Sequence, residues 1–162
     1  LILLFLPYFP YSKHAHLFMG PLNIMAITER KSMAALEKIN FEDDDIEQFG
    51  ASQIQHLPQT QLLDGYACIQ CSRCQDACPA YETGKELSPS ALEINKRYFF
   101  NENLDLLAKG EMIDKTLTDW MLTEEAAWSC TTCGYCVEVC QVRNDPMAVS
   151  YTHLTLPTSD LV

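Results

Sequence analysis

Basic residues are scarce in this chain of 162 residues, which has 11 lysines and arginines against 22 aspartates and glutamates and a formal net charge of −11. A protein this acidic repels the phosphates of nucleic acids and of anionic lipid head groups. We therefore expect no nucleic-acid partner. The acidic run EDDDIE at residues 42–47 is typical of a solvated turn or helix start, and the alternative is a docking patch for a basic partner.

A long apolar run is also missing. The most apolar stretch, LILLFLPYF at residues 1–9, is shorter than the about 20 residues that cross a bilayer. Tyr8 and Tyr11 form an aromatic border of the kind found at membrane interfaces, and positive charges mark the cytoplasmic side. Those charges are Lys13, Arg30, Lys31 and Lys38.

Because the chain starts with leucine, we expect a piece of a longer protein, in which residues 1–27 are the end of a membrane helix and its cytoplasmic exit. A core strand and a signal peptide are the alternatives, and the second would need a basic start and a cleavage site of small residues. Residues 28–66 are predicted to be an acidic helical connector.

Cysteine is absent outside two stretches, CIQCSRCQDACP at residues 68–79 and CTTCGYCVEVCQ at residues 130–141, which hold all eight cysteines. Disulfides within such tight groups would close very short loops, which suit bridge geometry poorly. Zinc ribbons usually take two ligands from each of two distant turns. The spacing C-x2-C-x2-C-x3-C is instead typical of bacterial 4Fe-4S proteins, so residues 67–148 are predicted to form a ferredoxin-type domain with two 4Fe-4S clusters.

The fourth cysteine of each run is expected to cross to the other cluster, as in two-cluster ferredoxins. Cluster 1 would then be held by Cys68, Cys71, Cys74 and Cys140, and cluster 2 by Cys130, Cys133, Cys136 and Cys78. Pro79 follows the first run as the pattern requires, but Gln141 follows the second. That glutamine leaves the thiolate in place, and it is either a neutral variation or a change that alters the cluster potential through a new donor near Cys140.

Sustained alternation with a period of two residues is absent, so we expect a mainly α domain. A short helix is predicted within residues 57–67. Ser88 can cap a helix with Pro89 in its first position, Ser90 and Glu93 have capping-box spacing, and this helix is expected to end near residue 101. Further helices are predicted from about residue 103 to residue 110, at residues 116–122, and after a Thr123 cap.

Two smaller features complete the sequence. His14 and His16 raise the question of haem b, but two alternating histidines beside a lysine are more typical of polar residues at a membrane interface, so any haem is assigned to the rest of the intact protein. Residues 149–162 bear no relation to the cluster region, and Ser150–Thr158, SYTHLTLPT, resembles a translated sequencing adapter. We expect this tail to be an artefact.

The runs LLDGYACIQCSRCQDACPAYETGKELSP and EEAAWSCTTCGYCVEVCQV resemble the cluster region of membrane-bound iron-sulfur oxidoreductases related to the heterodisulfide reductase D subunit. The resemblance is strongest to the bacterial type that accepts electrons from electron-transfer flavoprotein and passes them to menaquinone. LPYFPYSKHAHLFMGPLNIM resembles the exit from that family's membrane domain, so the likeness covers roughly residues 3–148. Ser72 and Gln141 depart from the family's usual glycine and proline.

The resemblance implies a protein of the cell membrane whose cluster domain lies on the cytoplasmic side. It implies electron transfer from electron-transfer flavoprotein, or another redox donor, through two 4Fe-4S clusters toward a membrane quinone, without a bond-breaking catalytic site in this chain. The cysteine motifs alone also fit the iron-sulfur subunits of glycolate oxidase and glycerol-3-phosphate dehydrogenase. A zinc-bound structural or interaction module is the alternative of another class.

Overall fold

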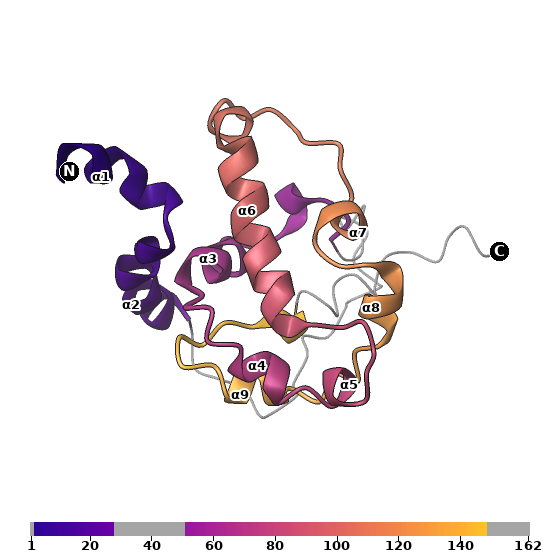
Figure 1. Cartoon of the computed structure of the whole chain (residues 1–162). Helices are drawn as coiled ribbons and strands as arrows, with labels where there is room; N and C mark the ends of the chain where they lie inside the picture. The colour runs from indigo at the N-terminus through magenta and orange to yellow at the C-terminus, as the bar shows by residue number, and fades with distance from the viewer. Residues whose placement is uncertain (1, 28–50, 149–162) are drawn as a thin grey trace.

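The computed structural model describes residues 2–27 and 51–148 (Figure 1). The acidic run at residues 42–47, most of the predicted connector and the suspected artefactual tail lie outside the described residues. The domain boundaries expected from the sequence stay predictions.

Short helices dominate the described residues, in the order α1 (Ile2–Tyr8), η1 (Phe9–Tyr11), η2 (Lys13–Ala15), α2 (His16–Ala26), η3 (Ile54–His56), α3 (Gln59–Ala67), α4 (Arg73–Asp76), α5 (Pro79–Glu82), α6 (Pro89–Ala108), α7 (Leu117–Trp120), α8 (Glu124–Trp128) and α9 (Tyr135–Glu138). Extended pairing in these residues amounts to one isolated antiparallel bridge between Gln53 and Thr116. The expected mainly α fold is confirmed.

Helix α6 is the centre of the arrangement, with α3 against its side and α4 packed at its N-terminal end (Figure 1). The hydroxyl of Ser88 accepts a hydrogen bond from the Ala91 amide at 3.1 Å, and Pro89 occupies the first turn, as predicted. The predicted capping box is wrong, because Ser90 and Glu93 are both buried inside the helix.

Helix α6 is also longer than predicted, since it continues through the asparagines at which we expected it to end. Tertiary contacts hold Asn101 in the helix: its Oδ1 accepts from the Tyr66 hydroxyl at 2.9 Å, and its Nδ2 donates to the Tyr11 carbonyl at 3.2 Å. Asn103 donates back to the Phe99 carbonyl at 2.8 Å. These bonds outweigh the modest helix propensity of asparagine, so one helix of 20 residues replaces the two that were predicted.

The other helix predictions, before and between the cysteine runs, agree with the structure. Thr116 and Asp119 form a reciprocal capping box at the start of α7. Thr123 caps α8 by accepting from the Ala126 amide at 3.1 Å. Helix α3 delivers the chain to Cys68, as expected for residues 57–67.

The largest apolar core lies between α6, α7 and the segment before α3. Phe99 of α6 stacks on Trp120 of α7 with ring centroids 3.9 Å apart. The buried members of this core are Ala51, Ile54, Leu57, Leu92, Phe99, Ile113, Leu117 and Met121. This core packs against α6 from Leu92, near the start of the helix, to Phe99, near its middle.

Helices α1 and α2 lie to one side of this body, and α2 packs against α3 (Figure 1). No helix in the described parts of the chain is long and apolar enough to span a membrane. Helix α1 has seven residues and buries none of them.

Candidate metal centres

The two cysteine runs adopt the same local structure. In each, the first two cysteines lie in a loop and the third lies in a short helix, Cys74 in α4 and Cys136 in α9. The fourth, Cys78 or Cys140, lies two positions after the last residue of that helix. Helices α4 and α9 pack against each other, so the two runs lie side by side (Figure 1).

Backbone conformation repeats as well. The residues on either side of the second cysteine are left-handed in both runs: Gln70 (φ 57°) and Ser72 (φ 62°) in the first, Thr132 (φ 51°) and Gly134 (φ 75°) in the second. Alternation of left-handed and ordinary residues turns successive N–H groups toward one side, which makes a concavity suited to anions such as Fe–S clusters. The loops therefore offer donors as well as thiols.

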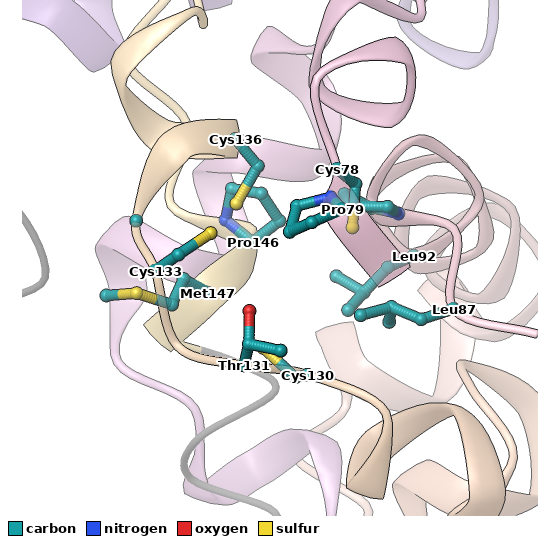
Figure 2. Close-up of a pocket in the computed structure, with 12 residues that line it drawn as sticks. Cys78, Pro79, Leu87, Leu92, Cys130, Thr131, Cys133, Cys136, Pro146 and Met147 are labelled. Atoms are coloured by element: carbon teal, nitrogen blue, oxygen red, sulfur yellow. The ribbon is translucent and has the colours of Figure 1, made fainter. Parts of the chain in front are cut away.

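One cavity, which we call cavity 2, is lined by three cysteines of the second run and one of the first: Cys130, Cys133, Cys136 and Cys78. Figure 2 shows Cys78 on one side and Cys133 and Cys136 on the other, with their sulfur atoms turned toward the space between them. The rest of the lining is mostly apolar and comprises Pro79, Leu87, Pro89, Leu92, Thr131, Gly134, Pro146 and Met147. The thiol groups are thus the main potential metal ligands in this cavity.

The other cavity, cavity 1, is lined by Cys68, Cys71, Cys74 and Cys140, three from the first run and one from the second. Its remaining lining is more polar: Ile69, Gln70, Ser72, Arg73, Ser90, Glu93, Gln141, Val142, Asn144 and Pro146. Pro146 lines both cavities and so separates them. The structure thereby brings together the two sets of four cysteines that the crossed pattern predicts.

Burial makes several of these thiols poor acids in the absence of a cation. It raises the pKa of Cys68 to about 11 and that of Cys74 to about 12, with the neighbouring sulfurs adding to the effect. Burial also raises the pKa of Cys136 and that of Cys140, whose sulfur accepts from the Asn144 amide at 3.3 Å. Thiolates so placed need cationic partners to become stable.

The donor sets fit iron-sulfur clusters. All eight cysteines are free thiols, which leaves the disulfide alternative without support. Within the described residues, no three His, Cys, Asp or Glu side chains converge as ligands of a single metal ion would; the thiols instead stand around two cavities. Four thiols around one cavity, in loops whose left-handed residues suit N–H donation, are the donor set that a 4Fe-4S cluster takes.

Sequence reasoning missed three residues near the cysteines. Glu93 and Asn144 line cavity 1, and Pro146 lies between the cavities. Glu93 is fully buried, and burial raises the pKa of its carboxyl to about 7 although Lys96 Nζ, 2.9 Å from Oε2, opposes that shift. Glu93 looked like part of a helix cap, and nothing in the local sequence marks the other two as neighbours of the first cysteine run.

Comparison with known proteins agrees with this chemistry. Residues 64–144 match the family described as "4Fe-4S dicluster domain". The chain is 35% identical over 89% of its length to the "Probable iron-sulfur-binding oxidoreductase FadF" of Bacillus subtilis, and 30% identical over 85% to an "EtfAB:quinone oxidoreductase" of Syntrophomonas wolfei. A "Fumarate reductase iron-sulfur subunit" of Escherichia coli O157:H7 is 35% identical over 50% of the chain and 31% of its own length.

The chain spans 25% of the first of these relatives and 22% of the second. A "Probable membrane-anchored ferredoxin" of Chromohalobacter salexigens is 28% identical over 75% of the chain and 21% of its own length. No solved structure is significantly similar to the chain. The family match covers half of the chain and both cysteine runs, and together with the iron-sulfur relatives it identifies the cofactors as two 4Fe-4S clusters. The chain therefore belongs to the 4Fe-4S dicluster domain family.

Proposed function

We propose that this chain conducts electrons between a flavoprotein donor and menaquinone at the cell membrane. The observation that carries the proposal is the mixed lining of the two cavities, each with three cysteines of one run and one of the other. A bound cluster supplies one-electron chemistry. The polypeptide supplies the thiolates, excludes water with its lining and keeps the two centres on either side of Pro146.

The ligands follow from this arrangement. Cluster 1 is assigned to Cys68, Cys71, Cys74 and Cys140 in cavity 1, and cluster 2 to Cys130, Cys133, Cys136 and Cys78 in cavity 2. Each fourth ligand crosses between the runs, so neither run can complete a site alone. This crossing couples the folding of the two runs, because metal binding contributes directly to the folding free energy.

The donor and acceptor are inferred from relatives. The Syntrophomonas wolfei protein is named as an EtfAB:quinone oxidoreductase, and the chain is similar to it over 85% of its length. A flavoprotein donor, a quinone acceptor and kinship with the heterodisulfide reductase D subunit are therefore proposed for the longer protein to which we assign this chain. The strongly acidic composition favours a donor whose docking face is basic.

Membrane attachment is supported by the N-terminal helices. Leu3 and Leu4 of α1 are 84% and 78% exposed, and Met25 of α2 is 81% exposed. Side chains this apolar are rarely left in water as a contiguous group. We assign these helices to the membrane side of the protein and the cluster domain to the cytoplasmic side, where thiols stay reduced.

The ligand assignment is tested with two alanine variants of the anaerobically reconstituted chain. Cys140→Ala should disturb the cluster in cavity 1 and Cys136→Ala the cluster in cavity 2, which electron paramagnetic resonance resolves as losses of different signals. The unsubstituted chain should bind about eight irons. Loss of the same signal in both variants would show that each run is self-contained, and stoichiometric zinc would favour the structural module.

The function is tested in isolated membranes that contain the full-length protein. Reduced electron-transfer flavoprotein should bleach the visible cluster absorbance near 400 nm, and an added menaquinone analogue should restore it. A washed protein that stays soluble, or clusters that only another donor reduces, would instead favour a soluble iron-sulfur subunit such as those of glycolate oxidase or glycerol-3-phosphate dehydrogenase.

A further inference from the structure

Asn23 of α2 is a polar side chain with no contact with solvent, since its exposed fraction is 0%. Its Nδ2 lies 2.7 Å from Asp64 Oδ1, 3.2 Å from Asn144 Oδ1 and 3.2 Å from the Val142 carbonyl oxygen. These acceptors come from two segments that are far from α2 in the sequence. One side chain thus joins α2 to the end of α3 and to the loop after Cys140.

Asn144 extends these contacts to the cysteines. Its backbone amide donates to Cys140 Sγ at 3.3 Å, and its Nδ2 donates to the Asp64 carbonyl at 2.6 Å. That same carbonyl accepts the amide of Cys68 at 2.9 Å and so ends α3. Asn144 therefore contacts Cys140 directly, and it shares the Asp64 carbonyl as a hydrogen-bond acceptor with Cys68. These two cysteines belong to different runs but line the same cavity.

The carboxylate of Asp64 completes the network. It is 3% exposed, and its Oδ2 accepts from the Asp145 amide at 3.1 Å while its Oδ1 accepts from Asn23. Burial raises the pKa of this carboxyl against the opposing effects of Lys96 and of these donors. Removing a donor would leave a buried carboxylate oxygen without a partner, which is costly.

We propose that Asn23 is a positioning residue for cluster 1, acting through Asp64 and Asn144 on the loop that carries Cys140. The proposal rests on the ligand assignment made above. Asn23 fixes the loop of residues 142–145 against α3, and this holds the Asn144 amide on Cys140 Sγ. Because hydrogen bonds to ligand sulfurs stabilise the reduced, more negative cluster, loss of Asn23 lowers the potential of cluster 1 and leaves that of cluster 2 unchanged.

The experiment compares Asn23→Ala with Asn95→Ala in the anaerobically reconstituted chain. Asn95 is a matched control, since its Nδ2 also donates to a backbone carbonyl, that of Met121 at 3.0 Å, and it lines neither cavity. Redox titration monitored by electron paramagnetic resonance gives the two potentials, and iron analysis gives the cluster content. Asn23→Ala should shift one signal to lower potential, and Asn95→Ala should shift neither.

A second variant, Asn144→Ala, keeps the backbone donor but removes both side-chain bonds, so it should shift the same signal in the same direction. Loss of cluster 1 alone, at about four irons per chain, also supports the proposal. The proposal would be overturned if Asn23→Ala and Asn144→Ala left both cluster potentials unchanged or shifted both equally. Loss of both clusters in these two variants would overturn it as well. Cys140→Ala identifies the cluster 1 signal independently, so a wrong ligand assignment is recognised separately from a wrong role for Asn23.

Discussion

At the scale of single residues, the two cluster loops solve the same conformational problem with different side chains. Both require left-handed backbone after the second cysteine, and the second loop uses Gly134 there while the first uses Ser72. Only glycine takes this conformation without steric cost, which is about 1–2 kcal/mol for other residues. The resemblance described in the sequence analysis implies glycine at position 72, and the structure places Ser72 in the left-handed region that favours glycine.

The substitutions Gly134→Ser and Ser72→Gly should change the stability of the protein in opposite directions. Gly134→Ser places a side chain at φ 75° and should destabilise the protein by about 1 kcal/mol. Ser72→Gly relieves strain but gives the unfolded chain more freedom, so its effect should lie between zero and about 1 kcal/mol of stabilisation. Melting temperatures of the anaerobic, reconstituted variants measure both. Destabilisation by Ser72→Gly would mean that its side chain contributes a contact that outweighs the backbone strain.

The cysteines could be predicted from the sequence and their neighbours could not. Ligand identity is encoded in local spacing, and the grouping across runs follows from the chemistry of two-cluster proteins. Asn144 and Glu93 reach cavity 1 only because α3, α6 and the loop after Cys140 pack together, which is a tertiary effect without a local pattern. The identity of the eight ligands as a set stays a prediction until the substitutions are made.

At the scale of elements, α3 and α6 approach each other closely at Gly65. A methyl group at Gly65 would lie 3.2 Å from Lys96 Cβ and 3.3 Å from the Arg97 amide nitrogen. One is a backbone atom of α6 and the other is attached directly to that backbone, so neither can move aside as a side-chain end would. Glycine in the middle of a helix costs stability, so its presence here is explained by this contact, which also brings Cys68 toward cavity 1.

Gly65→Ala should therefore destabilise the protein although alanine favours helices. Overpacking costs about 1–3 kcal/mol and the gain in helix propensity is about 1 kcal/mol, so the net loss should be up to about 2 kcal/mol. Thr60→Ala, at an exposed position of the same helix, is the control and should change stability little. A Gly65→Ala variant that melts higher than the unsubstituted chain would show that α3 and α6 can separate without penalty.

Helix starts were predicted better than helix ends. Ser88 and Thr123 cap the helices expected of them, because a cap is a local hydrogen bond to an amide three residues on. The end of α6 was wrong because the partners of Asn101, Tyr66 and Tyr11, are distant in the sequence. Local chemistry therefore set the beginnings, and packing set the lengths.

At the scale of the whole molecule, the two cavities differ in polarity and in position. Among the residues that the structure describes, the lining of cavity 2 has no charged side chain, whereas that of cavity 1 includes Arg73, Glu93 and several amide and hydroxyl groups. The negative charge of Glu93 is offset by Lys96, with 2.9 Å between Oε2 and Nζ. Reduction adds negative charge to a cluster, and a polar environment with donors stabilises that charge better than an apolar one.

The positions of the two cavities relative to α2 bear on the direction of electron transfer. Cavity 1 is the one nearer α2, because a methyl group at Gly20 would meet Val142 Cγ1 at 3.4 Å and Asn23 bonds the same loop. Cavity 2 lies on the other side of Pro146. If α1 and α2 face the membrane as proposed, an electron that enters at cavity 2 and moves to cavity 1 travels toward the quinone.

We accordingly expect the potential of cluster 1 to be more positive than that of cluster 2, so that this transfer is downhill. Redox titration of the reconstituted chain should show two reduction steps, and Cys140→Ala should remove the one at the higher potential. Leu87→Gln, which places a polar group in the lining of cavity 2, should raise the potential of cluster 2 and reduce the difference between the two potentials. If Cys140→Ala instead removed the reduction step at the lower potential, the negative charge of Glu93 would be the main influence on the potential of cluster 1. Electrons would then stay at cluster 2, which is remote from α2.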